Sequence, residues 1–381
     1  MNKYECYMTC PRGIENILSQ EITQIINKKN VIDAGGVKFT GSNEDIYRLN
    51  YHSRVGMNLL IKLFEGNADN TDVLYKLIYD YDWHKLISPD KTFFIRSKIN
   101  SRVIANQNFT TLKIKDAIVD RINKEVGSRP SIDKKYPDYY ITIYIKEKRV
   151  MVYLNSSGKP LFKRGYRTKI HKAALNESLA AGLILLSNWN KEKPFYDIMC
   201  GSGTIPIEAA MMAYNIPPGI LRKNFGFQKW DDYDSDLWSR IVTNAKEKIS
   251  FKNEIPIYGS DYFNKNIELA IHSAKQINLN QKIKFKSLNI NDFKPESNSG
   301  VIIINPPYGN RIGDQEIINR LYKNIGDIFK TYCIGFDTYI FTGNLDAIKS
   351  IGLRSRRRII LKNGKIDCRL LYYPISSGKF K

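Results

Sequence analysis

Residues 195–204 read Phe-Tyr-Asp-Ile-Met-Cys-Gly-Ser-Gly-Thr, and this stretch decides the fold class of the chain. An apolar run comes first, a turn with two glycines follows, and a helical pattern opens at Thr204. A strand that ends in a glycine turn and leads into a helix is the opening unit of a doubly wound α/β fold. We therefore predict that the stretch lies at the carboxyl edge of a mostly parallel sheet.

The chain after this stretch repeats the alternation of strand and helix. Strand patterns cover 195–199, 255–259, 283–288, 301–304 and 338–342, and helical patterns cover 205–214, 264–278 and 316–329. This alternation predicts a Rossmann-like parallel sheet with helices on both faces. The irregular segment 214–255 is too rich in aromatic residues to be a flexible linker.

The chain before residue 190 has a different pattern. Strand patterns at 92–97, 139–145 and 149–154 are mixed with helical patterns at 14–26, 71–79 and 112–126. The last two strands are joined by Lys146-Glu147-Lys148 and are typical of a hairpin. We expect an α+β region built on an antiparallel sheet.

The composition describes a folded protein with a large excess of positive charge. The 381 residues allow two or three domains, and a hydrophobic content of 43% is ordinary for such a chain. A net charge of +21 predicts a polyanionic partner such as RNA, although a Lys-rich genome bias would produce the same excess without a partner.

Neither membrane insertion nor metal binding is indicated. The longest apolar runs are of strand length, and the N-terminal residues lack the apolar stretch of a signal peptide, so we expect a cytoplasmic protein. The five cysteines are scattered and form no CxxC pair, which predicts reduced thiols and no metal site.

The glycine turn is a candidate cofactor site. The turn contributes Asp197, Cys200, Gly201, Gly203 and Thr204, and it lacks both the third glycine of a dinucleotide fingerprint and the Lys of a phosphate loop. Such a turn suits a ligand with a nucleoside and no pyrophosphate, and S-adenosylmethionine fits that description. A plain junction between strand and helix is the alternative.

Acidic residues follow the next two strands. Asp261, with Tyr262 beside it, is placed to accept both ribose hydroxyls, and Asp292 is placed to accept from the adenine amino group while Phe293 packs on the ring. Each aspartate taken alone is also typical of a helix cap. Their order after the glycine turn favours the cofactor interpretation.

The tetrapeptide Asn305-Pro306-Pro307-Tyr308 directly follows the strand 301–304 and predicts the acceptor site. Proline cannot continue a central strand, so the residues form a fixed turn at the sheet edge. The Asn305 side-chain oxygen and the Pro306 carbonyl can accept the two hydrogens of an exocyclic base amine, which directs its lone pair at a methyl group. Tyr308 offers a face on which a flipped base can stack.

At this point the sequence resembles the THUMP-domain methyltransferases, and within them the RlmL-like large-subunit rRNA guanine-N2 methyltransferases. The resemblance covers nearly the whole chain. It is carried by residues 111–120, 163–167, 173–177, 199–204, 225–230, 305–309, 342–344 and 362–370.

The resemblance implies a ferredoxin-like segment at residues 1–50, a THUMP RNA-binding domain at 51–155 and a class I methyltransferase domain at 156–381. The catalytic sheet should have seven strands, one of them antiparallel near the C-terminus. One catalytic domain implies one methylation activity. The implied substrate is guanine N2 of 23S rRNA, with tRNA guanine N2 as the close alternative.

The resemblance also assigns roles to single residues. Asp197, Gly201 and Gly203 would surround the methionine part of S-adenosylmethionine, and Glu177 would contact its carboxyl-terminal side. Asp261 would hold the ribose and Asp292 the adenine. Asn305 and Tyr308 would hold the base.

Cations and one exposed aromatic residue are candidate RNA contacts, although a solvated surface charge is the alternative for each cation. They are Arg54, Arg96, Lys98, Arg102, Phe109, Lys113, Lys115, Lys163, Arg164, Arg167 and Arg311.

Other functions remain open at this stage. A DNA amine methyltransferase, a protein glutamine N-methyltransferase and a non-catalytic RNA-binding factor are the alternatives. The resemblance of the N-terminal half to an RNA-binding module argues against the first. The net charge of +21 and the basic N-terminal domain argue against the second, and the intact glycine and acceptor turns argue against the third.

Overall fold

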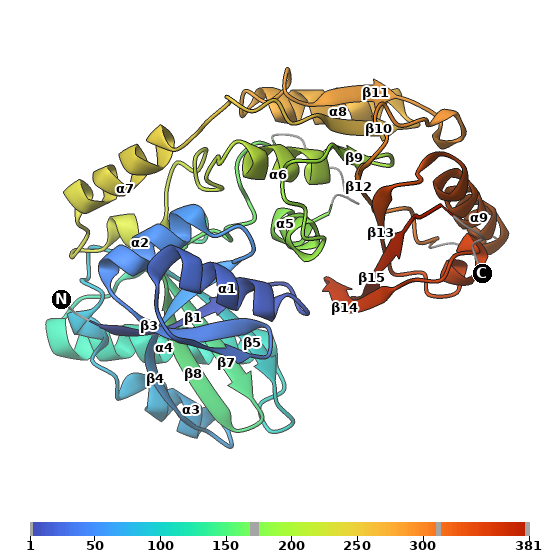
Figure 1. Cartoon of the computed structure of the whole chain (residues 1–381). Helices are drawn as coiled ribbons and strands as arrows, with labels where there is room; N and C mark the ends of the chain where they lie inside the picture. The colour runs from blue at the N-terminus through green and yellow to red at the C-terminus, as the bar shows by residue number, and fades with distance from the viewer. Residues whose placement is uncertain (1–2, 168–174, 310–313, 378–381) are drawn as a thin grey trace.

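The computed structural model describes residues 3–167, 175–309 and 314–377, and it divides into two parts that are each built on one sheet (Figure 1). The N-terminal part contains an eight-stranded sheet and the C-terminal part a seven-stranded one. No helix within these ranges is both long and apolar enough to cross a lipid bilayer. All five cysteines are free and buried.

The N-terminal sheet has the strand order β2-β3-β1-β4-β8-β7-β5-β6. Its strands are β1 (Tyr4–Thr9), β2 (Asn30–Asp33), β3 (Gly36–Gly41), β4 (Asn58–Asn67), β5 (Thr92–Asn100), β6 (Ser131–Ile132), β7 (Tyr139–Lys146) and β8 (Arg149–Asn155). Because β4 pairs with both β1 and β8, the regions expected to be ferredoxin-like and THUMP share one continuous sheet. The expected hairpin of β7 and β8 is confirmed.

The expected antiparallel pairing is confirmed across the sheet from β2 to β7, but it is wrong at β5 and β6. β5 runs parallel to both β7 and β6. The long helix α4 (Gln107–Val126) lies between β5 and β6 in the chain, and this crossover returns the chain to the same end of the sheet, which makes parallel pairing possible. The expected domain limits at residues 50 and 155 remain a prediction; α2 (Asn43–His52) extends past the first of them.

Four helices supply the apolar cover of the N-terminal sheet: α1 (Glu15–Ile26), α2, α3 (Thr71–Tyr79) and α4. Side chains alternate along a strand, so Cys6 and Met8 of β1 join the core with Leu18 and Ile46, while Tyr7 points to the other face. The same alternation in β8 buries Val152 and leaves Arg149 on the face of Tyr7.

The C-terminal sheet has the order β11-β10-β9-β12-β13-β15-β14, and only β15 runs antiparallel to its neighbours. The strands are β9 (Phe195–Asp197), β10 (Ile257–Asp261), β11 (Lys284–Ser287), β12 (Gly300–Ile304), β13 (Phe336–Thr342), β14 (Arg357–Asn363) and β15 (Ile366–Pro374). The predicted parallel sheet with one antiparallel strand is therefore confirmed.

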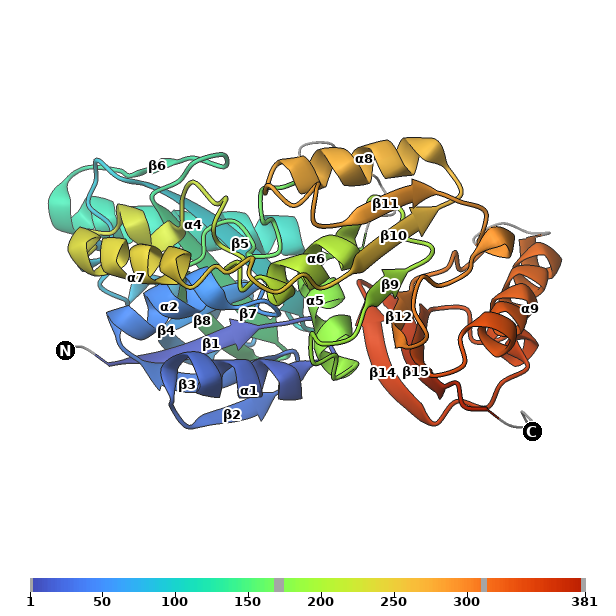
Figure 2. The ribbon, with the colours of Figure 1, turned by 45° about the horizontal axis from the view of Figure 1, so that its top comes forward.

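Helices cover both faces of this sheet, as predicted. Phe195 and Ile303 face a core shared with α5 (Glu177–Leu186), α6 (Thr204–Ala213) and α8 (Asn264–Lys275). Tyr196 and Ile302, their neighbours in sequence, face a second core formed with α9 (Asp314–Tyr332). Figure 2 shows α8 over β10 and β11 and α9 at the other end of the domain.

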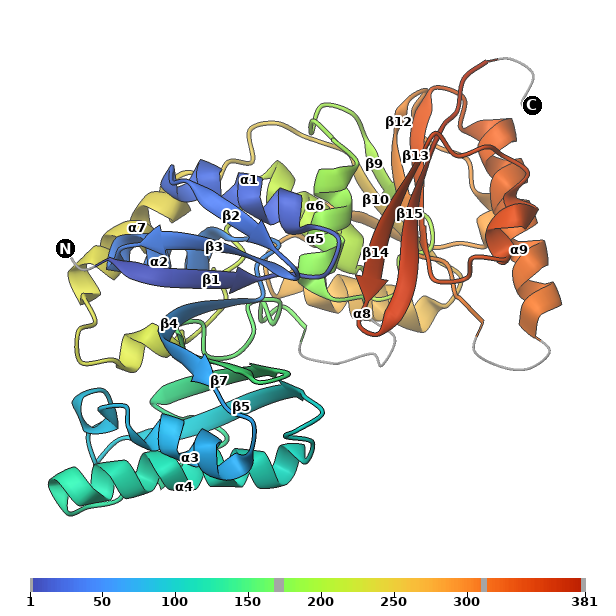
Figure 3. The same cartoon turned by 90° about the horizontal axis from the view of Figure 1, so that it is seen from below.

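The two parts are joined along α1, α5 and β14 (Figure 3). A Cβ on Gly182 of α5 would lie 2.8 Å from the Ile14 side chain, so glycine permits this close approach. The segment 214–255 also belongs to the joint, through η2 (Gly226–Lys229) and α7 (Ser235–Glu247). Phe227 stacks on Tyr47 of α2 with ring centroids 4.2 Å apart, which confirms that the segment is no flexible linker.

Candidate active site

The glycine turn starts where β9 ends. The carboxylate of Asp197, which is only 1% exposed, accepts a hydrogen bond from the Met199 amide at 3.2 Å. The Cys200 amide donates to the Ser260 carbonyl at 2.8 Å, and this bond ties the turn to β10. Burial raises the pKa of Asp197 well above its ordinary range, and a cationic ligand group nearby would favour its ionised form.

The two glycines of the turn have different surroundings. Both have positive φ, +53° at Gly201 and +79° at Gly203. A Cβ on Gly203 would lie 2.7 Å from the Ala270 Cβ, so this glycine lets α6 approach α8. A Cβ on Gly201 would meet no described atom within 4 Å. The backbone at Gly201 therefore borders open space, as a cofactor site requires.

Asp261 ends β10 and is held firmly beside this turn. One carboxylate oxygen accepts from the Gly201 amide at 3.0 Å, and the other accepts from the Phe263 amide at 3.0 Å and the Asn266 side chain at 2.9 Å. A carboxylate offers about four acceptor positions and three are taken here, so about one remains for a ribose hydroxyl. Asn266 was missed by the sequence interpretation because its role depends on a helical turn of α8 bringing it back to Asp261.

Two exposed aromatic side chains follow Asp261. Tyr262 is 65% exposed and Phe263 63%, with their rings 5.1 Å apart in an edge contact. Exposure of two large aromatic rings at the end of a strand is typical of a ligand surface. Phe263 was not among the predicted site residues, although its position next to Asp261-Tyr262 was visible in the sequence.

The structure corrects the role expected for Phe293. Its side chain is 5% exposed and packs in the second core, with its ring centroid 6.0 Å from that of Tyr196. It therefore does not present a face to an adenine ring. Asp292, at the end of η3 (Ile290–Asp292), is exposed and stays a candidate for the adenine amino group.

The acceptor turn lies beside the glycine turn because β12 pairs in parallel with β9. The Tyr308 hydroxyl donates to the Asn305 side-chain oxygen at 2.8 Å, and the Asn344 side chain donates to the Tyr308 carbonyl at 2.7 Å. The Tyr308 ring packs near Gly343, where a Cβ would lie 3.1 Å from it. Burial raises the pKa of Tyr308, so its hydroxyl stays protonated.

Glu177, Arg167 and Thr204 form a buried polar cluster that joins α5 to α6. The Arg167 guanidinium donates to the Leu175 carbonyl at 2.6 Å and to the Thr204 hydroxyl, and it lies 3.6 Å from the Glu177 carboxylate. Burial raises the pKa of Glu177, an effect that Arg167 partly opposes. Arg167 therefore positions the first turns of both helices, and we no longer expect it to contact RNA.

Arg54 and Arg164 also lie inside the protein. Arg164 is 1% exposed and donates to the Leu161 carbonyl at 2.9 Å, to the Arg54 carbonyl, and to Glu208 at 3.4 Å. Arg54 donates to the Met211 carbonyl at 3.4 Å, and burial lowers its pKa. The prediction that these two arginines contact phosphates is therefore wrong. Charge in the sequence does not reveal which side chains a helix covers.

The other candidate RNA contacts have varied surroundings. Arg96, Lys98, Arg102 and Lys163 are exposed. Lys113 lies 6.0 Å from the centre of the exposed Phe109 ring, and Lys115 pairs with Asp116 at 2.5 Å. Arg311 lies outside the described residues.

The strand order, the glycine turn and the acceptor turn together define a class I methyltransferase that uses S-adenosylmethionine. A family model described as RMKL-like, methyltransferase domain, matches residues 164–372, and the chain belongs to this family. Models of the THUMP domain and of the RlmL ferredoxin-like domain match residues 68–155 and 5–57.

Known proteins resemble the chain over its whole length. It is 36% identical over 97% of its length to a putative RNA methyltransferase of Synechocystis sp., of which 96% is covered. It is 33% identical over 100% of its length to the ribosomal RNA large subunit methyltransferase K/L of Allochromatium vinosum, but spans only 53% of that protein. The crystal structure of SMU.472, a putative methyltransferase complexed with SAH, matches it with a TM-score of 0.89 at 29% identity, covering 100% of both chains.

Proposed function

We propose that the chain transfers a methyl group from S-adenosylmethionine to the exocyclic N2 amine of a guanine in large-subunit rRNA. The observation that carries this proposal is the position of Asn305, directly after β12 and beside the glycine turn that follows β9. Parallel neighbours end at the same sheet edge, so donor and acceptor turns lie side by side.

Each residue of the site has a defined task in the proposed reaction. Asp261 holds the ribose, and the open backbone at Gly201 admits the methionine part of the cofactor. When bound, S-adenosylmethionine supplies an electrophilic methyl group on a sulfonium. The Asn305 oxygen and the Pro306 carbonyl accept the amine hydrogens and orient the nitrogen lone pair. Positioning carries most of the catalysis because the methyl donor is already activated.

One contact in the structure competes with that arrangement. The Tyr308 hydroxyl occupies the Asn305 oxygen that a base amine would need. Since burial keeps Tyr308 protonated, this hydroxyl is a donor that competes with the amine and not a general base. An amide oxygen can accept two hydrogen bonds, so a base amine either shares the Asn305 oxygen with Tyr308 or displaces the Tyr308 hydroxyl, which would free its ring for stacking.

Three observations support RNA as the substrate. A THUMP domain model matches residues 68–155, the net charge is +21, and the curated relatives are named as RNA or ribosomal RNA methyltransferases. The K/L name of the Allochromatium protein supports large-subunit rRNA, and guanine N2 follows from the resemblance to the RlmL-like enzymes. Location in the cytoplasm stays a prediction.

Mass spectrometry of nucleosides from a deletion strain tests this proposal. We expect N2-methylguanosine to fall in the large-subunit rRNA pool, and to return with the wild-type gene but not with Asn305→Ala. Loss from the tRNA pool would favour the tRNA alternative, and loss of a methylated amine from DNA would favour a DNA enzyme. An unchanged set of methylated nucleosides in all three pools would contradict the proposal.

A further inference from the structure

The face of the N-terminal sheet that carries Tyr7 contains a groove that the catalytic residues do not use. It has a volume of about 660 Å³ and is bordered by β1, β7, β8, the start of α5 and the turn between β14 and β15. We call it the basic groove, because six cations line it against one carboxylate, that of Asp33. The cations are Arg12, Lys38, Lys98, Lys146, Arg149 and Lys362.

The strand register places three of these cations on one face of the sheet. Lys98 of β5 pairs with Tyr144 of β7, and two residues further along, Lys146 of β7 pairs with Arg149 of β8. Residues paired in register point to the same face, so these side chains form adjacent rows above the sheet. Lys98 and Lys146 are both exposed at this face. Among the residues that line the groove, Lys98 alone was predicted from the sequence to contact RNA.

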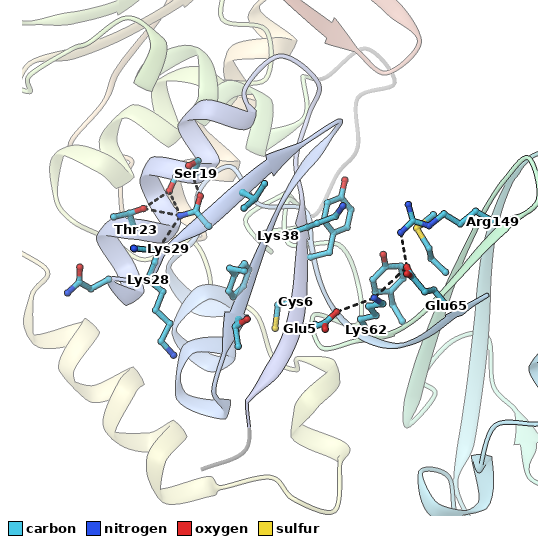
Figure 4. A pocket seen from close by; sticks show the side chains of 18 residues that line it. Glu5, Cys6, Ser19, Thr23, Lys28, Lys29, Lys38, Lys62, Glu65 and Arg149 are labelled. Atoms are coloured by element: carbon cyan, nitrogen blue, oxygen red, sulfur yellow. Dashed lines mark hydrogen bonds and ion pairs between the residues drawn. The ribbon is translucent and has the colours of Figure 1, made fainter. Parts of the chain in front are cut away.

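A second hollow of about 1050 Å³ shares Lys38 and Arg149 with the basic groove (Figure 4). Lys38 pairs with Asp33 at 2.7 Å, and Arg149 pairs with Glu65 at 2.8 Å. Figure 4 shows Lys62 of β4 and Arg149 of the neighbouring strand β8 both bonded to Glu65, and Glu5 bonded to Lys62. The exposed ion pairs are weak, so a phosphate can replace the carboxylates as partner.

Three tyrosines form the floor of the basic groove. Tyr153 lies between Tyr7 and Tyr144, with ring centroids 6.3 Å and 5.8 Å away. Tyr7 and Tyr144 are partly exposed. Cations around aromatic rings are the arrangement that binds unpaired nucleic acid, because phosphates contact the cations and unstacked bases contact the rings.

At β14 the groove reaches a place where the two parts of the chain are in direct contact. The Lys362 amide donates to the Arg12 carbonyl at 3.2 Å, and Gly13 fits directly against the Ile360 carbonyl of β14. Asn363, the last residue of β14, lines the groove and lies near the Tyr308 side chain. An RNA strand lying in the groove would therefore come close to Tyr308 of the acceptor turn.

We propose that the basic groove binds an unpaired RNA segment that flanks the target nucleotide and leads it to Asn305 and Tyr308. This inference rests on the proposed function for the identity of the nucleic acid as RNA. An A-form duplex is recognised by its shape across a wide minor groove and offers no unstacked base to the tyrosines. The groove chemistry therefore favours single-stranded RNA as the occupant.

The test measures the affinity of the protein for two RNAs. One is an unstructured single strand of about 16 nucleotides, and the other is a duplex of equal length. The double variant Lys98→Gln/Lys146→Gln removes two groove cations. We expect it to bind the single strand about tenfold more weakly. We also expect the slope of log K against log salt to flatten by about 0.7 for each lost phosphate contact. Tyr144→Leu should weaken single-strand binding without changing this slope.

The matched control is Lys246→Gln/Lys323→Gln, which removes the same charge from exposed positions on α7 and α9. The inference is overturned if groove and control variants bind the single strand equally, or if only duplex binding falls. These readouts need no methyl transfer. If the groove does not bind RNA, the nucleoside analysis can still support guanine methylation. If guanine N2 is not the methylated position, the groove variants should still bind the single strand more weakly than the control.

Discussion

At the scale of the residue, the Tyr308 hydroxyl competes with a base amine for the Asn305 oxygen, to which it donates a hydrogen bond. Tyr308→Phe keeps the ring for stacking and removes this competing donor. We expect KM for RNA to fall by about 2- to 10-fold with little change in kcat, since one such bond contributes roughly 0.5–1.5 kcal/mol. Steady-state methyl transfer to rRNA from the deletion strain measures both constants.

Two further variants control this prediction. Asn305→Ala removes the acceptor itself and should lower kcat by about 10²- to 10³-fold, by analogy with the loss of one oriented hydrogen-bond partner. Asn305→Asp keeps an acceptor oxygen and should retain part of the rate. If Tyr308→Phe lowered kcat as strongly as Asn305→Ala, the hydroxyl would have a chemical role and our interpretation would be wrong.

At the scale of elements, the turn between β9 and α6 places two glycines in similar backbone conformations for different reasons. Gly203→Ala puts a methyl group 2.7 Å from Ala270, so it should lower the free energy of unfolding by about 2 kcal/mol or more. Gly201→Ala meets no described atom but fills the open space, so we expect its main effect on cofactor affinity.

The positive φ strains alanine at both positions by about 1 kcal/mol. Because this strain is common to the two variants, the difference between them separates packing from ligand binding. Urea unfolding gives the stability change, and calorimetric titration with S-adenosylhomocysteine gives the affinity. Gly201→Ala should weaken binding at least tenfold. Equal losses of stability and of affinity in the two variants would show that the open space at Gly201 is not the cofactor site.

At the scale of the whole molecule, Arg164 joins the two parts of the chain. It contacts the Arg54 carbonyl in the N-terminal part and Glu208 of α6 in the catalytic part. Arg164→Met leaves the Glu208 carboxylate buried without this partner, and we expect the free energy of unfolding to fall by about 3–5 kcal/mol. The double variant Arg164→Met/Glu208→Gln removes the unpaired charge and should recover much of that loss in urea unfolding. If the double variant were as unstable as the single one, the lost free energy of unfolding would come from packing and not from the unpaired charge.

Local patterns in the sequence were enough to predict the catalytic sheet and its two turns. The parallel strands and the helices between them occur as expected, because the alternation of apolar residues and the glycine and proline turns act over a few neighbouring residues. The single antiparallel strand also occurs, but it was expected only from the resemblance to the THUMP-domain methyltransferases. The N-terminal sheet was predicted less well. Parallel pairing of β5 with β7 depends on where α4 returns the chain, which no local pattern specifies.

The chemistry of the site divides in the same way. The sequence by itself determined that a glycine turn, Asp261 and Asn305 each follow a strand of one sheet. Only the tertiary structure decided that Arg164 and Arg167 are internal, that Phe293 belongs to a core and that Tyr308 bonds Asn305. The physical reason is that residue type and spacing are properties of the chain, whereas burial and the partner of a polar group depend on which distant segment packs against it.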